Sequence, residues 1–350
     1  MSIKIKFITK ANTYQNGFDF SHMFPKKEPI LDSCSFSFNA DDTDYDWVVV
    51  YEDLPPNQQK KECPLKVSCD PRKTLLITTE PYGVKFYPKE YTQQFFHVIT
   101  SHRKNELYHK NATLMQSGLI WFYSKKGVKS EFDYLSTMPV PEKNNTISVV
   151  CSSKKNSRTL HSRRLSFVEK LKQKISLIDH FGHGVRGVSE KHLALDSYKY
   201  HISIENYVAE HYWSEKISDA FLGYSLPFYY GCPNIGDYFP EDSYIEIDIF
   251  DVEKSCEIIC SAIKGNLWEK RIETIIEARK LYLNNYSLFN NISAFVTKAD
   301  QCLIGDEHSE FDLYSRQSVR SLNFRCLISH LNQSFWHHMN KRQLINGLGL

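Results

Sequence analysis

The sequence predicts an α/β fold in which two Rossmann-like domains face a central cleft. Its 350 residues are enough for two domains of roughly 150 residues each. Short apolar strands separated by polar loops fill the first half, and strands alternate with helices in the second half. We expect an N-terminal domain over residues 1–140, a second domain over 141–290 and a helical tail over 291–350.

The first half shows strand patterns that end in polar loops. Ile3, Ile5 and Phe7 alternate with lysines, which is typical of a first strand. Further apolar runs predict strands over residues 46–51, 73–78 and 95–100. Ligands gather at such loop edges in open α/β sheets. Residues 124–145 carry two prolines and several lysines without an apolar period, so we interpret them as the interdomain linker.

The second half alternates between the two element types. Apolar runs predict strands over 146–151, 178–181, 200–204, 226–230 and 244–249. Apolar residues at helical spacing predict helices over 162–175, 213–224, 252–263 and 268–282.

Composition narrows the class of protein. The formal net charge is +2, which gives no reason to expect a nucleic-acid partner. The nine cysteines include no CxxC pair, and this favours a reducing compartment such as the cytoplasm. No segment approaches the ~20 apolar residues of a spanning helix.

The last part of the chain is basic. From Leu313 onward there is no Asp or Glu, whereas three arginines precede a final Lys341-Arg342 pair. Such a tail suits peripheral contact with an anionic membrane surface. A C-terminal helix that packs on one of the domains is the other interpretation.

The segment from Tyr198 to Phe239 is dense in polar side chains. Glu205 and Asn206 end a predicted strand, and Glu215 and Lys216 begin a predicted helix. A helix N-terminus favours anions such as a diphosphate, Lys216 adds a positive charge, and a carboxylate such as Glu215 can accept from two ribose hydroxyls. Taken alone, the same pair is also ordinary helix-dipole chemistry with a solvated lysine.

This segment resembles the signature of the family 10 glycosyltransferases, the α-1,3/1,4-fucosyltransferases. The matching pieces keep order and spacing: Tyr198-Lys199-Tyr200, Ile204-Glu205-Asn206, Tyr212-Trp213-Ser214-Glu215-Lys216, and Pro227 with Gly231. Tyr207, Trp213 and Ser214 depart from the family pattern but leave the polar positions intact. The resemblance is strong over about residues 146–265 and faint in the first half.

The resemblance implies roles for individual residues. Lys216 would meet the diphosphate and Glu215 the ribose, with Asn206 and Tyr212 lining the nucleotide site. Arg164-Leu165-Ser166-Phe167 is similar to the start of a family helix whose arginine binds phosphate. Arg163 is the alternative match, because so short a motif does not fix the register.

The family's general base is a glutamate that follows a strand of the N-terminal domain. Thr78-Thr79-Glu80-Pro81 matches that context, which makes Glu80 the candidate base; structurally, it could be only a turn residue. We expect no metal or other cofactor. The acidic run Asp41–Asp44 is interpreted as a solvated loop, and His180 and His183 lack neighbours that would complete a metal site.

The implied fold is GT-B, and the implied reaction is inverting transfer of L-fucose from GDP-L-fucose. The acceptor would be a hydroxyl of GlcNAc or Glc, in α-1,3 or α-1,4 linkage, within an oligosaccharide or lipid-linked glycan such as bacterial O-antigen or capsule. The expected place is the cytoplasm, with peripheral inner-membrane contact. A family member that uses another GDP-deoxysugar such as GDP-colitose, and a non-catalytic sugar-nucleotide-binding protein, are the alternatives.

Overall fold

The computed structural model describes residues 2–10, 19–55, 64–153 and 160–347. The chain divides into two compact units. Unit 1 comprises Met1–Gly118 with Leu288–Leu350, and unit 2 comprises Leu119–Ser287. This division differs from the expected boundaries: residues 119–140 lie in unit 2, and the C-terminal segment belongs to unit 1.

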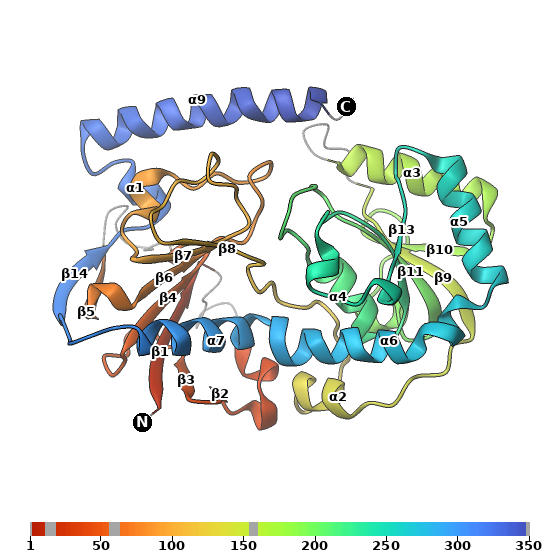
Figure 1. Cartoon of the computed structure of the whole chain (residues 1–350), viewed down its shortest axis with the longest axis horizontal. Coiled ribbons are helices and arrows are strands. Elements are labelled where there is room, and N and C mark those ends of the chain that lie inside the picture. The colour runs from red at the N-terminus through yellow and green to blue at the C-terminus, as the bar shows by residue number, and fades with distance from the viewer. Residues whose placement is uncertain (1, 11–18, 56–63, 154–159, 348–350) are drawn as a thin grey trace. The chain divides into compact units, whose positions relative to one another are not determined.

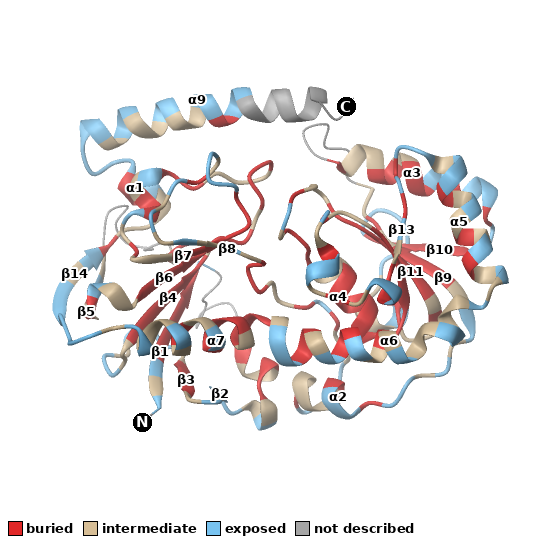
Figure 2. Cartoon of the chain, viewed as in Figure 1, coloured by how far each residue is buried: buried red, intermediate tan, exposed pale blue. Residues whose placement is uncertain are grey.

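Unit 1 is built on a sheet that is parallel apart from its short β2 edge. Within the described residues it has seven strands in the order β2-β3-β1-β4-β6-β7-β8. The strands predicted for the first half correspond to β1, β4, β6 and β7, which are adjacent in this sheet. The bounds are β1 Ile3–Thr9, β2 Ile30–Leu31, β3 Cys34–Ser37, β4 Trp47–Tyr51, β6 Thr74–Ile77, β7 His97–Thr100 and β8 Ala112–Leu114. Because both faces of a parallel sheet are covered, central strands such as β4 consist entirely of buried residues, as Figure 2 shows.

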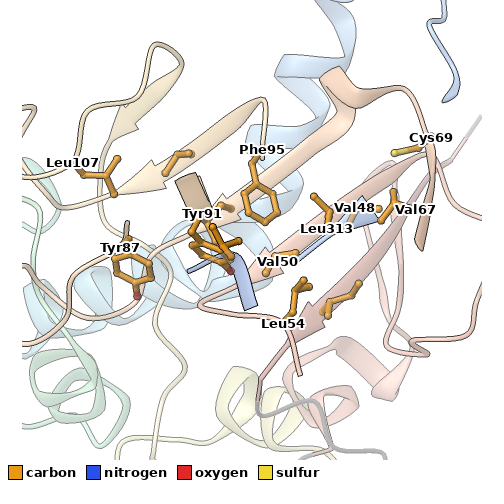
Figure 3. Packing of buried hydrophobic residues seen from close by; sticks show 14 residues of the cluster. Val48, Val50, Leu54, Val67, Cys69, Tyr87, Tyr91, Phe95, Leu107 and Leu313 are labelled. Carbon is orange, nitrogen blue, oxygen red and sulfur yellow. The ribbon is translucent and has the colours of Figure 1, made fainter. Parts of the chain in front are cut away.

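One core cluster of unit 1 joins distant parts of the chain. Val48 and Val50 of β4 pack there with Tyr87, Tyr91 and other buried side chains (Figure 3). Leu313, from the end of the chain, belongs to the same cluster and is 1% exposed. Burial of that residue anchors the C-terminal segment to the N-terminal sheet.

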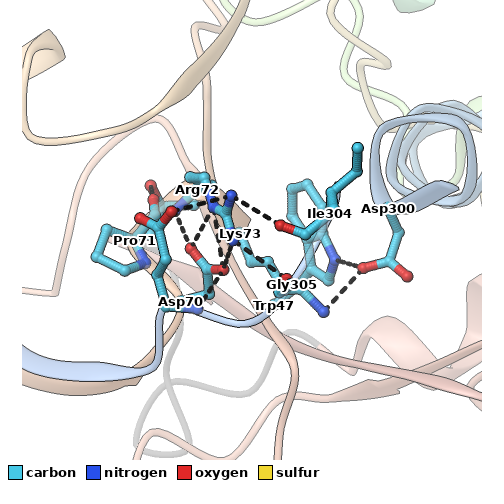
Figure 4. A network of polar contacts seen from close by, with 10 residues as sticks. Trp47, Asp70, Pro71, Arg72, Lys73, Asp300, Ile304 and Gly305 are labelled. Carbon is cyan, nitrogen blue, oxygen red and sulfur yellow. Dashed lines mark hydrogen bonds and ion pairs between the residues drawn. The ribbon is translucent and has the colours of Figure 1, made fainter. Parts of the chain in front are cut away.

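The C-terminal segment is therefore not a separate helical tail. It contains α7 Leu288–Gln301, β14 Ser309–Leu313, α8 Arg316–Val319 and α9 Phe324–Gly347. Strand β14 pairs antiparallel with β5 Leu65–Cys69. A polar network reinforces this attachment (Figure 4): Asp300 accepts from Trp47 Nε1 at 2.9 Å and pairs with Lys73 at 3.0 Å, and Arg72 reaches the carbonyl of Ile304 at 3.3 Å. The remaining helical pieces of unit 1 are α1 Lys89–Thr92 and 3₁₀ turns at Phe20–Met23, Pro25–Lys27 and Pro71–Lys73.

Unit 2 is a second parallel sheet, with strand order β10-β9-β11-β12-β13 in the described residues. Helices α4 and α6 pack together and against β12, and α3 packs against α5 (Figure 1). The strands are β9 Asn145–Val150, β10 Ile178–Phe181, β11 Tyr198–Ile204, β12 Leu226–Tyr230 and β13 Ile245–Glu246. The main helices are α3 His161–Lys174, α4 Glu215–Leu222, α5 Val252–Lys264 and α6 Leu267–Leu281. Shorter helical segments are α2 Glu131–Thr137, 3₁₀ turns at Lys191–Ala194, Ile235–Asp237 and Glu241–Ser243, and a π-helical turn at Tyr282–Tyr286.

Two local predictions for unit 2 differ from the structure. The supposed linker contains α2, which Ser130 caps by accepting from the backbone N–H of Asp133 at 3.2 Å; a helix this short shows no readable apolar period. The strand predicted over 244–249 forms its ladder only at Ile245–Glu246. Beyond it, the N–H of Asp248 donates to the Ser255 hydroxyl at 3.0 Å, which ends the ladder.

Both units are thus Rossmann-like, and the predicted α/β fold class is confirmed. None of the helices in the described part of the chain combines the length and apolar character needed to cross a bilayer.

Candidate functional site

Four of the predicted site residues lie where β11 gives way to α4. Asn206 lies just beyond the end of β11, Tyr212 lies in the connecting loop, and Glu215 and Lys216 are the first two residues of α4. This is the carboxyl edge of a parallel sheet, where ligands bind in open α/β folds. The helix begins at Glu215 because Ser214 is a polar N-cap residue whose hydroxyl accepts from the Lys216 N–H at 3.5 Å.

Glu205 organises this junction. Its buried carboxylate accepts from the backbone N–H of Ser214 at 2.8 Å and from the Ser214 hydroxyl at 2.6 Å. Lys216 Nζ lies 3.5 Å from Glu205 Oε2 and 2.9 Å from Ser214 Oγ. A buried carboxylate needs such partners, so Glu205 fixes both the helix cap and the lysine.

Glu215 and Lys216 form a charged pair, with Nζ 3.0 Å from Oε1. Burial raises the pKa of Glu215, but Lys216 and Lys191 outweigh it and lower that pKa to about 2. Burial lowers the pKa of Lys216, but Glu215 and Glu205 outweigh it and raise that pKa above its ordinary value. Both groups are therefore charged at neutral pH, and Glu215 is an acceptor-only group that can receive two hydroxyl hydrogen bonds.

Arg164 is the second cation near this junction. It lies on α3, is only 8% exposed, and its positive charge is close enough to Lys216 to disfavour the ammonium form. In the part of the chain that the structure describes, its buried Nε has no hydrogen-bond partner. A buried guanidinium donor without a partner is costly, so this group has capacity for an anionic ligand.

Arg163 has a different environment. Its guanidinium lies over the ring of Phe250 at 4.8 Å from the centroid, and it is less buried than Arg164. This contact is a surface cation–π pair. Of the two arginines left open by the sequence, Arg164 is the one whose buried Nε has no hydrogen-bond partner among the described residues.

Asn206 and Tyr212 are joined to each other. The Tyr212 hydroxyl donates to Asn206 Oδ1 at 2.8 Å. This hydrogen bond links the two ends of the loop between β11 and α4.

Glu80 lies in unit 1, in the loop that follows β6, and its backbone carbonyl accepts from His102 Nε2 at 2.8 Å. The structure thus groups five of the six predicted residues in unit 2 and places Glu80 in unit 1.

Two of the other candidates from the sequence, His180 and Asp44, have structural partners. His180 Nε2 contacts the carbonyl of Cys151 at 2.8 Å, and His183 is exposed. Asp44 pairs with Lys4 at 2.6 Å. Among the described residues, no three His, Cys, Asp or Glu side chains cluster so that they could hold a metal ion.

Sequence reasoning missed one member of this region. Lys191, in the connection between β10 and β11, pairs with the fully buried Asp219 of α4 at 2.6 Å. Asp219 also accepts from the N–H of Phe122 at 3.1 Å. Lys191 lies far upstream of the helix in sequence, and no local motif marks it.

The junction can therefore hold an anion with two cations and the N-terminus of α4, beside a carboxylate that accepts hydroxyl groups. Residues 140–264, which contain all five of these unit 2 residues, match the family model for glycosyltransferase family 10 (fucosyltransferase) C-term. This part of the chain is a family 10 glycosyltransferase domain. Each of the two units contains a Rossmann-like sheet of mainly parallel strands.

Other comparisons add similarity at low identity. No curated protein matches the chain. A crystal structure of α1,3-fucosyltransferase with GDP-fucose is 16% identical, with coverage of 87% of this chain and 92% of that chain and a TM-score of 0.48. The same enzyme class with GDP gives 17% identity, 83% and 92% coverage and a TM-score of 0.46. The crystal structure of TarM gives 9% identity, 72% and 54% coverage and a TM-score of 0.42.

Proposed function

We propose that the whole chain is a family 10 glycosyltransferase of GT-B fold, which transfers L-fucose from GDP-L-fucose, with inversion, to a hydroxyl group of GlcNAc or Glc in a bacterial surface glycan. An α-1,3 or α-1,4 linkage in O-antigen or capsule is the product we expect. One observation supports the donor half of this proposal: the buried Nε of Arg164, near Lys216, has no hydrogen-bond partner among the described residues. A diphosphate would give this guanidinium an anionic acceptor and would lie close to Lys216 and the N-terminus of α4.

The donor roles follow from the chemistry of each side chain. Arg164 and Lys216 bind the diphosphate, and ionised Glu215 accepts from the ribose hydroxyls. Asn206 and Tyr212 line the nucleotide site and hold its loop by their mutual hydrogen bond. As the bond between the fucose carbon and the diphosphate oxygen breaks, its electron pair stays on GDP. The two cations stabilise that charge without a metal ion or other cofactor.

Glu80 is the proposed general base. The acceptor oxygen attacks the fucose carbon from the face opposite to GDP, and the Glu80 carboxylate takes the hydroxyl proton. One bond to carbon forms as the other breaks, so the configuration inverts. Support for this role is the position of Glu80 in a loop at the carboxyl end of β6.

We also propose that the enzyme works in the cytoplasm with peripheral membrane contact through α9. The helix exposes large apolar side chains, including Leu331 at 58%, Phe335 at 62% and Trp336 at 64%. Arg320 and Arg325 are exposed near its start. Exposed apolar and basic groups together favour an anionic lipid surface. In a co-sedimentation assay, we expect a larger fraction of the wild-type protein to pellet with vesicles that contain phosphatidylglycerol than with neutral vesicles.

The identity of the sugar-nucleotide donor can be tested by calorimetry with a panel of GDP-sugars and UDP-sugars. We expect GDP-fucose and GDP to bind with similar enthalpy signatures and UDP-sugars to give no heat of binding. Stronger binding and turnover of another GDP-deoxysugar such as GDP-colitose would replace fucose in the proposal, and no binding of GDP would overturn it.

The variant Glu80→Gln tests the base. We expect transfer to fall by about 10²- to 10⁴-fold with GDP affinity unchanged, because Glu80 is assigned no donor contact. Transfer at the wild-type rate would remove Glu80 from the mechanism.

A further inference from the structure

The loop that carries Glu80 runs from the end of β6 to the start of α1. Its inner side is held by buried groups of unit 1. The N–H of Thr79 donates to the Tyr87 hydroxyl at 3.1 Å, and His102 Nε2 donates to the Glu80 carbonyl at 2.8 Å. Burial lowers the pKa of His102 to about 4, so the ring is neutral at pH 7. The proton on its Nε2 is fixed by this bond to a carbonyl, which only accepts.

The outer side of the same loop is held by α9, which lies more than 230 residues further along the chain. Helix α1 begins directly after the loop, and its N-cap Pro88 makes no side-chain cap hydrogen bond. Gln333 of α9 supplies the missing acceptor, since its Oε1 receives the N–H of Lys89 at 2.8 Å. Gln333 Nε2 and the Ser329 hydroxyl both donate to the carboxylate of Glu90. The first turn of α1 is therefore capped from α9 rather than locally.

Aromatic rings make the second contact. The His337 ring lies edge-to-face against Tyr82 at 4.5 Å and stacks near Phe86 at 5.5 Å. Tyr82 in turn meets the ring of His102 at 5.9 Å. His337 and Tyr82 are 9% and 6% exposed. A continuous set of packed rings thus runs from α9 to the histidine that holds the Glu80 carbonyl.

The two faces of α9 differ. Ser329, His330, Gln333 and His337 share the side that faces the loop, whereas Leu331 and Phe335 point to the outside, as their exposures of 58% and 62% show. This spacing is that of one helical face. The loop-facing positions are polar groups with specific partners, which differs from the purely apolar packing of a stabilising helix.

We propose that α9 is a positioning element for the reaction. Its Gln333 and His337 hold the loop between β6 and α1 in the conformation in which Glu80 can reach the acceptor hydroxyl. This inference rests on the proposed role of Glu80 as the base. A displacement of about 1 Å at a reacting group can reduce the rate by about 100-fold. The donor-binding residues all belong to unit 2, so loss of the α9 contacts should affect turnover and leave GDP affinity unchanged.

The experiment compares full-length variants on both faces of α9. Gln333→Ala, His337→Ala and the double variant remove the loop contacts, and His337→Phe restores the ring. Leu331→Ala and Phe335→Ala are matched controls on the outer face. The measurements are kcat and KM with GDP-fucose and soluble N-acetyllactosamine, GDP affinity by calorimetry, and amide hydrogen exchange of residues 79–91.

We expect the loop-facing alanine variants to lose about 10- to 100-fold in kcat with less than about a 2-fold change in GDP affinity, together with faster exchange over residues 79–91. His337→Phe should recover most of the rate, and the outer-face controls should behave like the wild type. An active wild type whose loop-facing variants keep both kcat and slow exchange would overturn the positioning role. A wild type that binds GDP but transfers no fucose would instead overturn the proposed function. In that case, amide hydrogen exchange remains a separate test of α9: unchanged exchange over residues 79–91 in the loop-facing variants would show that α9 does not hold the loop.

Discussion

Gly231 and Glu205 lie so close together that a Cβ atom at Gly231 would be 2.4 Å from Cγ of Glu205. Such an atom would also be 2.7 Å from the Tyr229 hydroxyl. Gly231 follows β12, and Glu205 follows the neighbouring strand β11. Glycine at this position therefore leaves the space in which the Glu205 carboxylate reaches Ser214 and Lys216.

The first prediction is that Gly231→Ala weakens GDP binding by displacing Glu205. We expect a loss of about 1–3 kcal/mol in the free energy of unfolding and about a 10-fold loss of GDP affinity, since Lys216 loses its fixed partner. Gly236→Ala is the matched control, because the nearest atom to its Cβ is the Tyr244 hydroxyl at 3.4 Å. Calorimetry and urea denaturation measure both effects, and equal behaviour of the two variants would contradict the role given to Gly231.

The second prediction separates the two arginines of α3. Arg164→Met should reduce GDP affinity by about 10- to 100-fold, the range of a charge-assisted hydrogen bond, whereas Arg163→Met should change it by less than about 3-fold. Because Arg164 Nε has no partner among the described residues, Arg164→Met should leave the free energy of unfolding without ligand unchanged or higher. A large loss of stability in that variant would show that Arg164 is structural.

The third prediction concerns the buried pair of Lys191 and Asp219. Their side chains are 14% and 0% exposed and lie 2.6 Å apart. Lys191→Met leaves the Asp219 carboxylate buried without its cation, which should cost about 3–5 kcal/mol in the free energy of unfolding. Lys199→Met removes the more exposed pair with Glu269, in which the side chains are 34% and 40% exposed, and should cost less than about 1 kcal/mol. Urea denaturation measures both values, and a similar loss of unfolding free energy in the two variants would show that the buried pair contributes no more than the exposed one.

Local patterns were sufficient to predict much of the fold. The strand β1 follows from apolar residues that alternate with lysines, and β4, β6 and β7 follow from short apolar runs. Helix α4 follows from apolar residues at helical spacing. The family match over residues 140–264 confirms the recognition made from the motif that ends in Glu215 and Lys216. These features depend on neighbouring residues, so they can be read from sequence.

Long-range contacts could not be predicted in this way. The chain returns to unit 1 after Ser287, because Leu313 and Asp300 find partners on strands laid down at the start of the chain. Gln333 caps a helix that begins at Lys89, and no spacing in the sequence relates these two residues. The same holds for Lys191 and Asp219, whose pairing depends on the tertiary fold.

The last prediction concerns the pH dependence of stability through His201 in β11. The Ser148 hydroxyl donates to the carbonyl of Ala194 at 2.6 Å and lies 2.8 Å from His201 Nδ1. Because the Ser148 hydroxyl has only one proton and donates it to Ala194, its oxygen must accept from His201, so His201 Nδ1 carries a proton. Burial, and then the charges of Lys191 and Lys143, lower the pKa of His201 from 6.5 to about 3.

A lowered pKa means that the unfolded state takes up a proton first as the pH falls. The stabilising contribution is therefore complete above pH 6.5 and is lost progressively between about pH 6.5 and 3. The expected loss from this one group is on the order of 5 kcal/mol. His201→Asn can keep a donor to Ser148 but does not titrate, so its free energy of unfolding in urea should fall less steeply over this interval. Parallel pH profiles for the wild type and His201→Asn would show that His201 does not carry this dependence.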